Sequence, residues 1–335
     1  MTIINLKKIL LARPRGFCAG VDYAIEIVNQ VRDLFSSEYN IFILNEIVHN
    51  KGIVAEYESQ GIKSVKSIEE VIYPPAPLAG GANKNKNILI FSAHGVPPEY
   101  HEIAKSHGII TIDATCPLVR KVHLEARRFA NDGYFIVYIG HTGHEEAVGV
   151  LAECPDQIIL VNNLQEAQNL IIPEKYSGCK LAYLTQTTLS VDETGEIINY
   201  LETQYPDIQG PAKEDICYAT TNRQKAVKEL AVNCDLVIVL GSQNSSNSQR
   251  LKESAIKLGT PAYLIDKPAQ INPDWLDNIQ TVGITAGASA PESIVQETIK
   301  YIQDLAINNI EVCELATVIE NTKFTLPKLD KNTIK

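Results

Sequence analysis

The sequence lacks the features that place a protein in a membrane. No apolar run approaches the roughly 18–20 residues that a membrane-spanning helix needs. Lys7 and Lys8 precede a short apolar run, but Arg13–Pro14–Arg15 interrupts it and no small-residue cleavage site follows. We therefore expect no membrane association and a cytoplasmic location.

Basic residues are also in deficit. The 335-residue chain has 30 Lys and Arg against 40 Asp and Glu, which gives a formal net charge of −10. A protein that binds nucleic acid usually presents a basic face to the phosphate backbone. We therefore expect no nucleic-acid partner, although a small anion could still bind in a local polar pocket.

Closely spaced cysteine pairs are absent as well. The seven cysteines are odd in number and far apart, and no Cys-X-X-Cys sequence occurs. This pattern argues against a framework of disulfides. It also excludes the local motifs of zinc ribbons and ferredoxin-type clusters. Any metal site must therefore combine cysteines from distant parts of the chain.

The most informative feature that is present is a threefold repeat. Cys18, Cys116 and Cys217 are 98 and 101 residues apart, and each opens a segment with apolar residues at helical spacing. Each predicted helix leads to an apolar strand. The three strands are predicted at 41–44, 134–139 and 235–240.

Polar residues repeat with the same period. One set lies in the loops after these strands: His49, His144 and Ser245. Another set follows a later strand of each repeat: His94, Thr187 and Ser289. Since ligand-facing residues of parallel α/β sheets lie beyond the carboxyl ends of strands, these side chains are placed to converge if the repeats pack around a common axis.

The repeat predicts an α/β fold with three pseudo-threefold-related domains and mainly parallel sheets. The expected domains are 1–115, 116–213 and 214–300, followed by a C-terminal segment, 301–335, that returns to the first domain and frays at its end. The strand before Cys217 is the least certain because residues 210–216 are polar.

The three repeated cysteines predict one shared metal site. A helix N-terminus favours the thiolate form of a cysteine. Three thiolates fit a 4Fe–4S cluster in which one iron lacks a protein ligand, or a zinc ion together with a histidine, and spacing does not choose between them. The other four cysteines fit no register and are expected to be small buried apolar residues: Cys154, Cys179, Cys234 and Cys313.

The polar residues predict an anion site. Their hydroxyl, amide and imidazole groups are hydrogen-bond donors that suit a phosphate or diphosphate. The candidates are His49, His94, His144, Thr187, Ser245, Ser246, Asn247 and Ser289. Glu145 or Glu146 could carry protons to a bound substrate, and spacing does not choose between them. His123, on the helix after Cys116, could support the site from behind.

Nine motifs, in order along residues 8 to 305, carry a resemblance to a known family. They are PRGFCAGVDYAI, EIVHN, SAHGV, DATCPLVRKVH, GHTGHEE, TQTTLSVDET, DICYATTNRQKAV, GSQNSSNSQRL and TAGASAPE. Together they closely resemble the 4-hydroxy-3-methylbut-2-enyl diphosphate reductases of the LytB family. The segment 74–87, which is expected to be an exposed loop, and the C-terminal tail lie outside this pattern.

The resemblance implies a trefoil of three α/β domains around an oxygen-sensitive 4Fe–4S cluster. It implies Cys18, Cys116 and Cys217 as cluster ligands, the eight polar residues above as the substrate site, and Glu146 as the proton donor. The implied reaction removes the allylic hydroxyl and yields isopentenyl and dimethylallyl diphosphate. Because no GxGxxG follows a strand, electrons would come from a separate protein, which in the family is a flavodoxin or a ferredoxin.

Three alternatives remain open at this point. A quinolinate-synthase-like enzyme also has three cysteines and an open iron, but its carboxylate substrates favour more Arg and Tyr in the pocket. A zinc hydrolase could use the same cysteines with a bound water. A non-catalytic protein could use the site only to bind a metal or a diphosphate.

Overall fold

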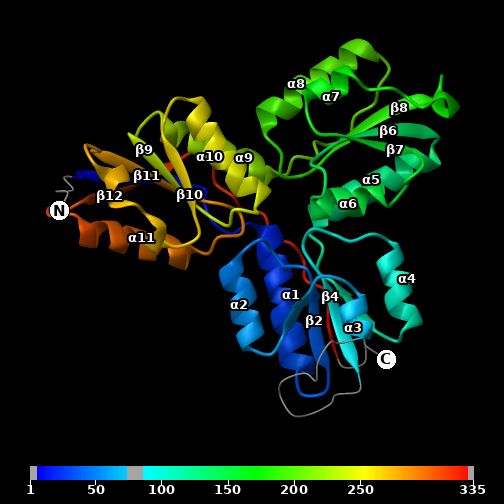
Figure 1. Ribbon diagram of the computed structural model, residues 1–335, viewed down its shortest axis with the longest axis horizontal. Helices are drawn as coiled ribbons and strands as arrows, with labels where there is room; N and C mark the ends of the chain where they lie inside the picture. Colours follow the sequence, from blue (N-terminus) through cyan, green and yellow to red (C-terminus); the bar gives the residue numbers. More distant parts are fainter. Residues whose placement is uncertain (1–5, 74–85, 331–335) are drawn as a thin grey trace. The chain divides into compact units, whose positions relative to one another are not determined.

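The computed structural model describes residues 6–73 and 86–330. Within these residues the chain alternates strands with helices and forms three sheets, in which every strand pair is parallel (Figure 1). The fold class expected from the sequence, an α/β protein with parallel sheets, is confirmed. Most of the segment 74–87, which was expected to be a loop, lies outside the described residues.

The four-stranded sheet has the order β3-β2-β4-β5. Its strands are β2 (Asn40–Leu44), β3 (Lys63–Val65), β4 (Asn87–Phe91) and β5 (Ile110–Asp113). The helices of this part are α1 (Ala19–Phe35), α2 (Lys51–Ser59), α3 (Glu69–Ile72) and α4 (Glu99–Ser106). The helix after Cys18, α1, and the strand that follows it, β2, were both expected from the repeat and are confirmed.

The three-stranded sheet has the order β7-β6-β8. Its strands are β6 (Tyr134–Ile139), β7 (Ile158–Val161) and β8 (Lys180–Thr185). Helices α5 (Pro117–Asn131) and α6 (Glu145–Leu151) pack on one face, and α7 (Leu164–Gln168) and α8 (Val191–Gln204) pack on the other. A short 3₁₀ turn spans Glu174–Tyr176. All six residues of β6 are buried because helices cover both faces of the sheet.

The five-stranded sheet has the order β10-β9-β11-β1-β12. Its strands are β1 (Lys8–Arg13), β9 (Leu236–Leu240), β10 (Ala262–Ile265), β11 (Thr281–Ala286) and β12 (Glu311–Ala316). Helix α11 (Glu292–Leu305) packs on one face, and α9 (Tyr218–Ala231) and α10 (Ser246–Lys257) pack on the other. Two 3₁₀ turns, Pro268–Gln270 and Pro273–Leu276, follow β10.

The described chain divides into two compact units. Of the described residues, unit 1 comprises 6–19, 49–51 and 217–323 and contains the five-stranded sheet. Unit 2 comprises 20–48, 52–73, 86–216 and 324–330 and contains the other two sheets. β1, which chain order assigns to the first expected domain, is hydrogen-bonded between β11 and β12. Residues 210–216, just before Cys217, form no strand.

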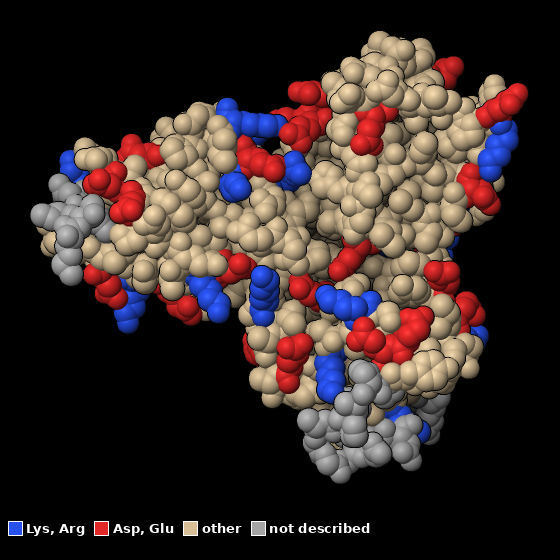
Figure 2. Space-filling view, viewed as in Figure 1, with Lys and Arg blue, Asp and Glu red and all other residues tan. Residues whose placement is uncertain are grey.

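Charges of both signs are mixed on the face that Figure 2 shows. In the view of Figure 2, Lys and Arg side chains lie among Asp and Glu side chains. Among the described residues, we find no helix that combines the length and the apolar character required to cross a membrane.

Candidate active site

The central feature of unit 2 is a buried carboxyl group. Glu146 lies in the first turn of α6 and is 1% exposed. The Thr187 backbone N–H donates to its Oε1 at 2.7 Å, and the Thr187 hydroxyl donates to its Oε2 at 3.0 Å. Burial raises the pKa of Glu146 to about 8, although both hydrogen bonds from Thr187 lower it. Glu146 therefore holds a proton at neutral pH, as a general acid must.

The neighbouring carboxylate has a different contact. Glu145 Oε2 lies 2.9 Å from His94 Nδ1, which is also 3.3 Å from the Ser92 hydroxyl. The rings of His94 and His144 meet edge to face, with centroids 6.2 Å apart. Glu145 thus contacts His94, whereas Glu146 contacts Thr187, so the two adjacent acids have different partners.

Two backbone links tie these side chains to Cys116 and to each other. Cys116 is the N-cap of α5, and its N–H donates to the carbonyl of Ala93, the residue before His94, at 3.0 Å. His144 is the N-cap of α6, and its Nδ1 accepts from the Glu146 N–H at 3.2 Å. Cys116, His94 and His144, which occupy repeated positions in the sequence, therefore lie close together in unit 2.

His123, for which a supporting role stays a prediction, packs against the backbone beside His94 and in α6. It is 6% exposed, and its Nδ1 lies 2.7 Å from Glu153 Oε1. A Cβ at Gly95 would lie 2.7 Å from His123 Nε2, and one at Gly149 would lie 3.0 Å from its Cε1. Both glycines thus let backbone pack directly on the imidazole, one beside His94 and the other in α6.

We expect Gly95→Ala to lower turnover by disturbing the His94 loop. Gly95 has φ +81°, so alanine there would be strained by about 1–2 kcal/mol and would also collide with His123, at a further cost of about 1–3 kcal/mol. Gly108→Ala is the matched control, because Gly108 has φ +66° with no atom near its Cβ position. Equal kinetics and equal thermal stability for the two variants would contradict this role of the close packing.

A second buried acid in unit 2 was not found by the sequence analysis. Asp215 is 4% exposed, accepts from the Thr185 N–H at 2.9 Å and pairs with Lys121 at 3.0 Å. Burial raises the pKa of Asp215 to about 7, while Lys121 lowers it. The charge of Asp215 also contributes to the raised pKa of Glu146. No repeat counterpart marks this residue, so only its three-dimensional neighbours identify it.

Unit 1 holds the other two repeated cysteines. Cys217 is the N-cap of α9, and its Sγ accepts from the Thr220 N–H at 3.4 Å. Cys18 immediately precedes α1, and its N–H donates to the carbonyl of Ala288 at 3.3 Å. The Tyr218 hydroxyl accepts from the Ala19 N–H at 3.3 Å, so the segments that carry Cys18 and Cys217 touch.

Two of the expected anion ligands of unit 1, His49 and Ser289, also lie close together. The Ser289 hydroxyl donates to the carbonyl of His49 at 3.0 Å, and the Asn50 side chain donates to the carbonyl of Ser289 at 2.7 Å. Ser245 is the N-cap of α10, and Ser246 is its first residue. These bonds bring the His49 and Ser289 registers together, next to the Ala288 carbonyl that holds Cys18.

Asn247 is the residue here that most directly indicates a ligand. It lies in the first turn of α10 and is 4% exposed, yet neither Nδ2 nor Oδ1 has a hydrogen-bond partner within residues 6–73 and 86–330. A buried amide without a partner costs about 1–3 kcal/mol. The N-terminus of a helix attracts anions. An anionic ligand would accept a hydrogen bond from Nδ2 and would also be favoured by the N-terminus of the helix.

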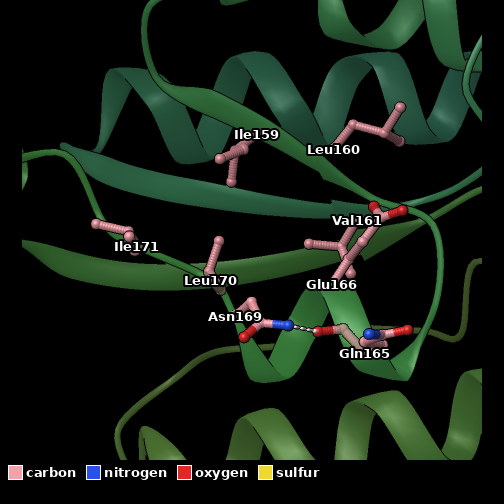
Figure 3. A pocket seen from close by; sticks show the side chains of 8 residues that line it. All are labelled: Ile159, Leu160, Val161, Gln165, Glu166, Asn169, Leu170 and Ile171. Carbon is pink, nitrogen blue, oxygen red and sulfur yellow. Dashed lines mark hydrogen bonds between the residues drawn. The ribbon is translucent and has the colours of Figure 1, made fainter.

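A cavity in unit 2 lacks a comparable set of hydrogen-bond donors and cysteines. It has a volume of about 470 Å³ beside β7 and α7 (Figure 3). Its lining residues are Ile159, Leu160, Val161, Gln165, Glu166, Asn169, Leu170 and Ile171. Glu166 is its one ionisable lining residue, and hydrogen bonds from Asn162 hold the pKa of that carboxyl below its usual range. The candidate site residues therefore lie around Cys116 and Glu146 in unit 2 and around Cys18, Cys217 and Asn247 in unit 1, and not at this cavity.

Fold and site together define an α/β protein with cysteines at helix N-termini, a buried glutamate that is protonated at neutral pH and a buried amide at the start of α10. A sequence model of the LytB protein family matches residues 9–303, and the chain belongs to this family. The resemblance seen in the nine motifs is thereby confirmed.

Relatives and solved structures agree with this assignment. The chain is 46% identical over 320 residues to 4-hydroxy-3-methylbut-2-enyl diphosphate reductase 1 of Mycobacterium tuberculosis, covering 96% of this chain and 93% of that protein. It is 46% identical over 325 residues to the reductase of Hahella chejuensis, covering 96% of each. The structure of the E-1-hydroxy-2-methyl-but-2-enyl-4-diphosphate reductase from Plasmodium falciparum matches with a TM-score of 0.86, 36% identity and 96% of each chain covered.

Proposed function

We propose that this protein reduces 4-hydroxy-3-methylbut-2-enyl diphosphate to isopentenyl and dimethylallyl diphosphate, the last step of the methylerythritol phosphate route. The observation that carries the proposal is Glu146, a buried acid that is protonated at neutral pH, hydrogen-bonded to Thr187 and adjacent to the His94–His144 pair. Relatives that carry this reductase name match 96% of the chain, which supports the same assignment.

The proposed cofactor is a 4Fe–4S cluster held by Cys18, Cys116 and Cys217, with one iron lacking a protein ligand. Among the described residues none of the cysteines forms a disulfide, and each of these three stands at the start of a helix. The N–H bond to Cys217 Sγ suits a thiolate. When bound, such a cluster supplies electrons and a Lewis-acidic iron to the substrate hydroxyl.

The proposed role of the polar residues is to anchor the diphosphate. Asn247 and the N-terminus of α10 supply donors and a favourable dipole on one side. The remaining donors are His49, His94, His144, Thr187, Ser245, Ser246 and Ser289. Holding the diphosphate fixes the position of the allylic hydroxyl at the other end of the substrate, which converts binding energy into orientation.

Glu146 then protonates the leaving hydroxyl, which departs as water. The net reaction consumes two electrons and two protons, so the acid must be recharged after each turnover. The Thr187 hydroxyl, which both donates and accepts, contacts Glu146 Oε2 and can pass a proton to it. The electrons are proposed to come from a separate flavodoxin or ferredoxin. The cytoplasmic location and the absence of nucleic-acid and membrane partners stay predictions.

Thr187→Val should shift the pH dependence of turnover. Turnover of the wild type should fall as pH rises through about 8, because Glu146 loses its proton there. The Thr187 hydroxyl lowers the pKa of Glu146, so its removal should raise that pKa and move the fall to higher pH.

Thr298→Val is the control for this shift. Thr298 is a fully buried threonine of α11 whose hydroxyl donates to the carbonyl of Ile294, outside the candidate site. Its pH profile of kcat should match the wild type. A Thr187→Val profile that falls at the same pH as the wild type would contradict the proposed coupling.

The function itself is tested by anaerobic turnover with a chemically reduced dye. The hydroxylated diphosphate should disappear and the two isomeric diphosphates should form. Release of inorganic phosphate or diphosphate would instead favour a hydrolase. Binding without any turnover would favour the non-catalytic alternative.

A further inference from the structure

Arg223 is the least expected side chain of unit 1. It lies on α9, six residues after Cys217, and it is 0% exposed. A buried arginine is costly unless its charge is paired and its N–H groups are bonded. All three nitrogens of this guanidinium make hydrogen bonds, which offsets the cost of its burial.

One side of the guanidinium holds the segment that leads into Cys18. Its Nε and Nη2 donate to the carbonyl of Gly16 at 3.0 and 2.7 Å, and Nη2 also donates to the carbonyl of Phe17 at 3.1 Å. These are the two residues immediately before Cys18. Since the Gly16 N–H donates to the carbonyl of Ala286 at 3.0 Å, this segment is bonded to both α9 and the end of β11.

The other side of the guanidinium binds the segment after β12. Arg223 Nη1 lies 3.1 and 3.2 Å from the two carboxylate oxygens of Glu320 and also donates to the carbonyl of Ala219. The Asn222 side chain donates to the same carboxylate at 3.0 Å. The counter-ion of Arg223 therefore comes from a part of the chain outside all nine family motifs.

We infer that Arg223 and Glu320 form a clamp that fixes the position of Cys18 relative to Cys217. The inference rests on the proposed function in taking these cysteines as ligands of one cluster. Arg223 and Glu320 are positioning residues, because they act through the backbone of Gly16 and Phe17. The C-terminal segment thereby becomes part of the cofactor site without contributing a ligand.

The clamp is tested first in metal-free protein. The labelling rates of individual cysteines with iodoacetamide are measured by peptide mass spectrometry for the wild type, Glu320→Gln and Arg223→Lys. Lysine keeps the charge but cannot form the fork that spans Gly16 and Phe17. We expect Cys18 to react at least about five-fold faster in both variants, while Cys116 and the buried Cys154 keep their wild-type rates. An unchanged labelling rate of Cys18, or an equal acceleration at Cys18, Cys116 and Cys154, would overturn the inference.

The loaded protein gives the second measurement. With the cluster in place, its visible absorption should decay at least about five-fold faster under a chelator in Glu320→Gln than in the wild type. Glu253→Gln is the control, since it removes the carboxylate partner of Arg250, on α10. Decay at the wild-type rate in Glu320→Gln would overturn the clamp. If the wild-type protein takes up no iron and sulfide, the proposed cofactor is wrong, and the clamp is then judged by the labelling rates alone.

Discussion

Glu146→Gln should bind the substrate normally and lose at least about 100-fold of its turnover. Glutamine has the shape of the protonated acid, so it can keep the contacts to Thr187, but it cannot give up a proton. The measurement is steady-state kinetics with a reduced dye under anaerobic conditions. The expected signature is a large fall in kcat with little change in the dissociation constant of the substrate.

Glu145→Gln is the matched control for this prediction. Glu145 contacts His94 and not Thr187, so we expect its loss to weaken substrate positioning and to raise KM by a few-fold, with a small change in kcat. If Glu145→Gln abolished turnover while Glu146→Gln remained active, the roles assigned to the two acids would be wrong.

The raised pKa of Glu146 can also be tested by measuring stability instead of enzymatic activity. The folded-state pKa of Glu146 is raised to about 8 from an ordinary value near 4.5, so the folded state binds this proton more tightly than the unfolded state. Its contribution to stability is therefore fully present below about pH 4.5 and is lost as pH rises through about 8. Glu146→Gln should remove this loss, and its free energy of unfolding relative to the wild type should improve between pH 6 and pH 9.

Replacing any one of Cys18, Cys116 and Cys217 by Ser should abolish both the visible absorption of the cluster and turnover. A thiolate is a far better ligand for iron in such clusters than a hydroxyl group. Cys179→Ser and Cys313→Ser are the controls, because both residues fit no register. Their iron content and kcat should match the wild type. Of the four cysteines expected to be buried only Cys154 is so; the expectation was wrong for Cys179, Cys234 and Cys313, which are partly exposed.

The three cysteine variants must act alike for the account to hold. A cluster that stayed stable and active in one of them would show that this cysteine is not a ligand. Loss of iron in Cys179→Ser or Cys313→Ser would show that the repeat register selects the wrong cysteines.

The sequence predicts the local elements well because each repeat carries its own hydrophobic pattern. The apolar runs at 41–44, 134–139 and 235–240 become β2, β6 and β9, and the helices after Cys116 and Cys217 begin at the following residue. The position of β1 could not be predicted in this way. Its pattern requires only a buried strand, and its partners, β11 and β12, lie near the other end of the chain.

The residues of the candidate site likewise fall into two groups, those that the repeat identifies and those that only the folded structure identifies. Cysteine and polar registers identify residues whose loops follow equivalent strands, as with His94 and Thr187. They do not identify residues that act through a fold-specific contact. The contact of Glu145 with His94 and the proposed clamp made by Arg223 depend on side-chain packing between segments that the repeat does not relate.

The central claim is that three cysteines, spaced about one hundred residues apart in the sequence, hold one iron–sulfur cluster. At this cluster the allylic hydroxyl of the substrate is removed by reduction. The most direct measurement is the iron, acid-labile sulfide and zinc content of protein purified without oxygen. We expect about four iron and four sulfide ions per chain and no zinc. Stoichiometric zinc without sulfide would contradict it.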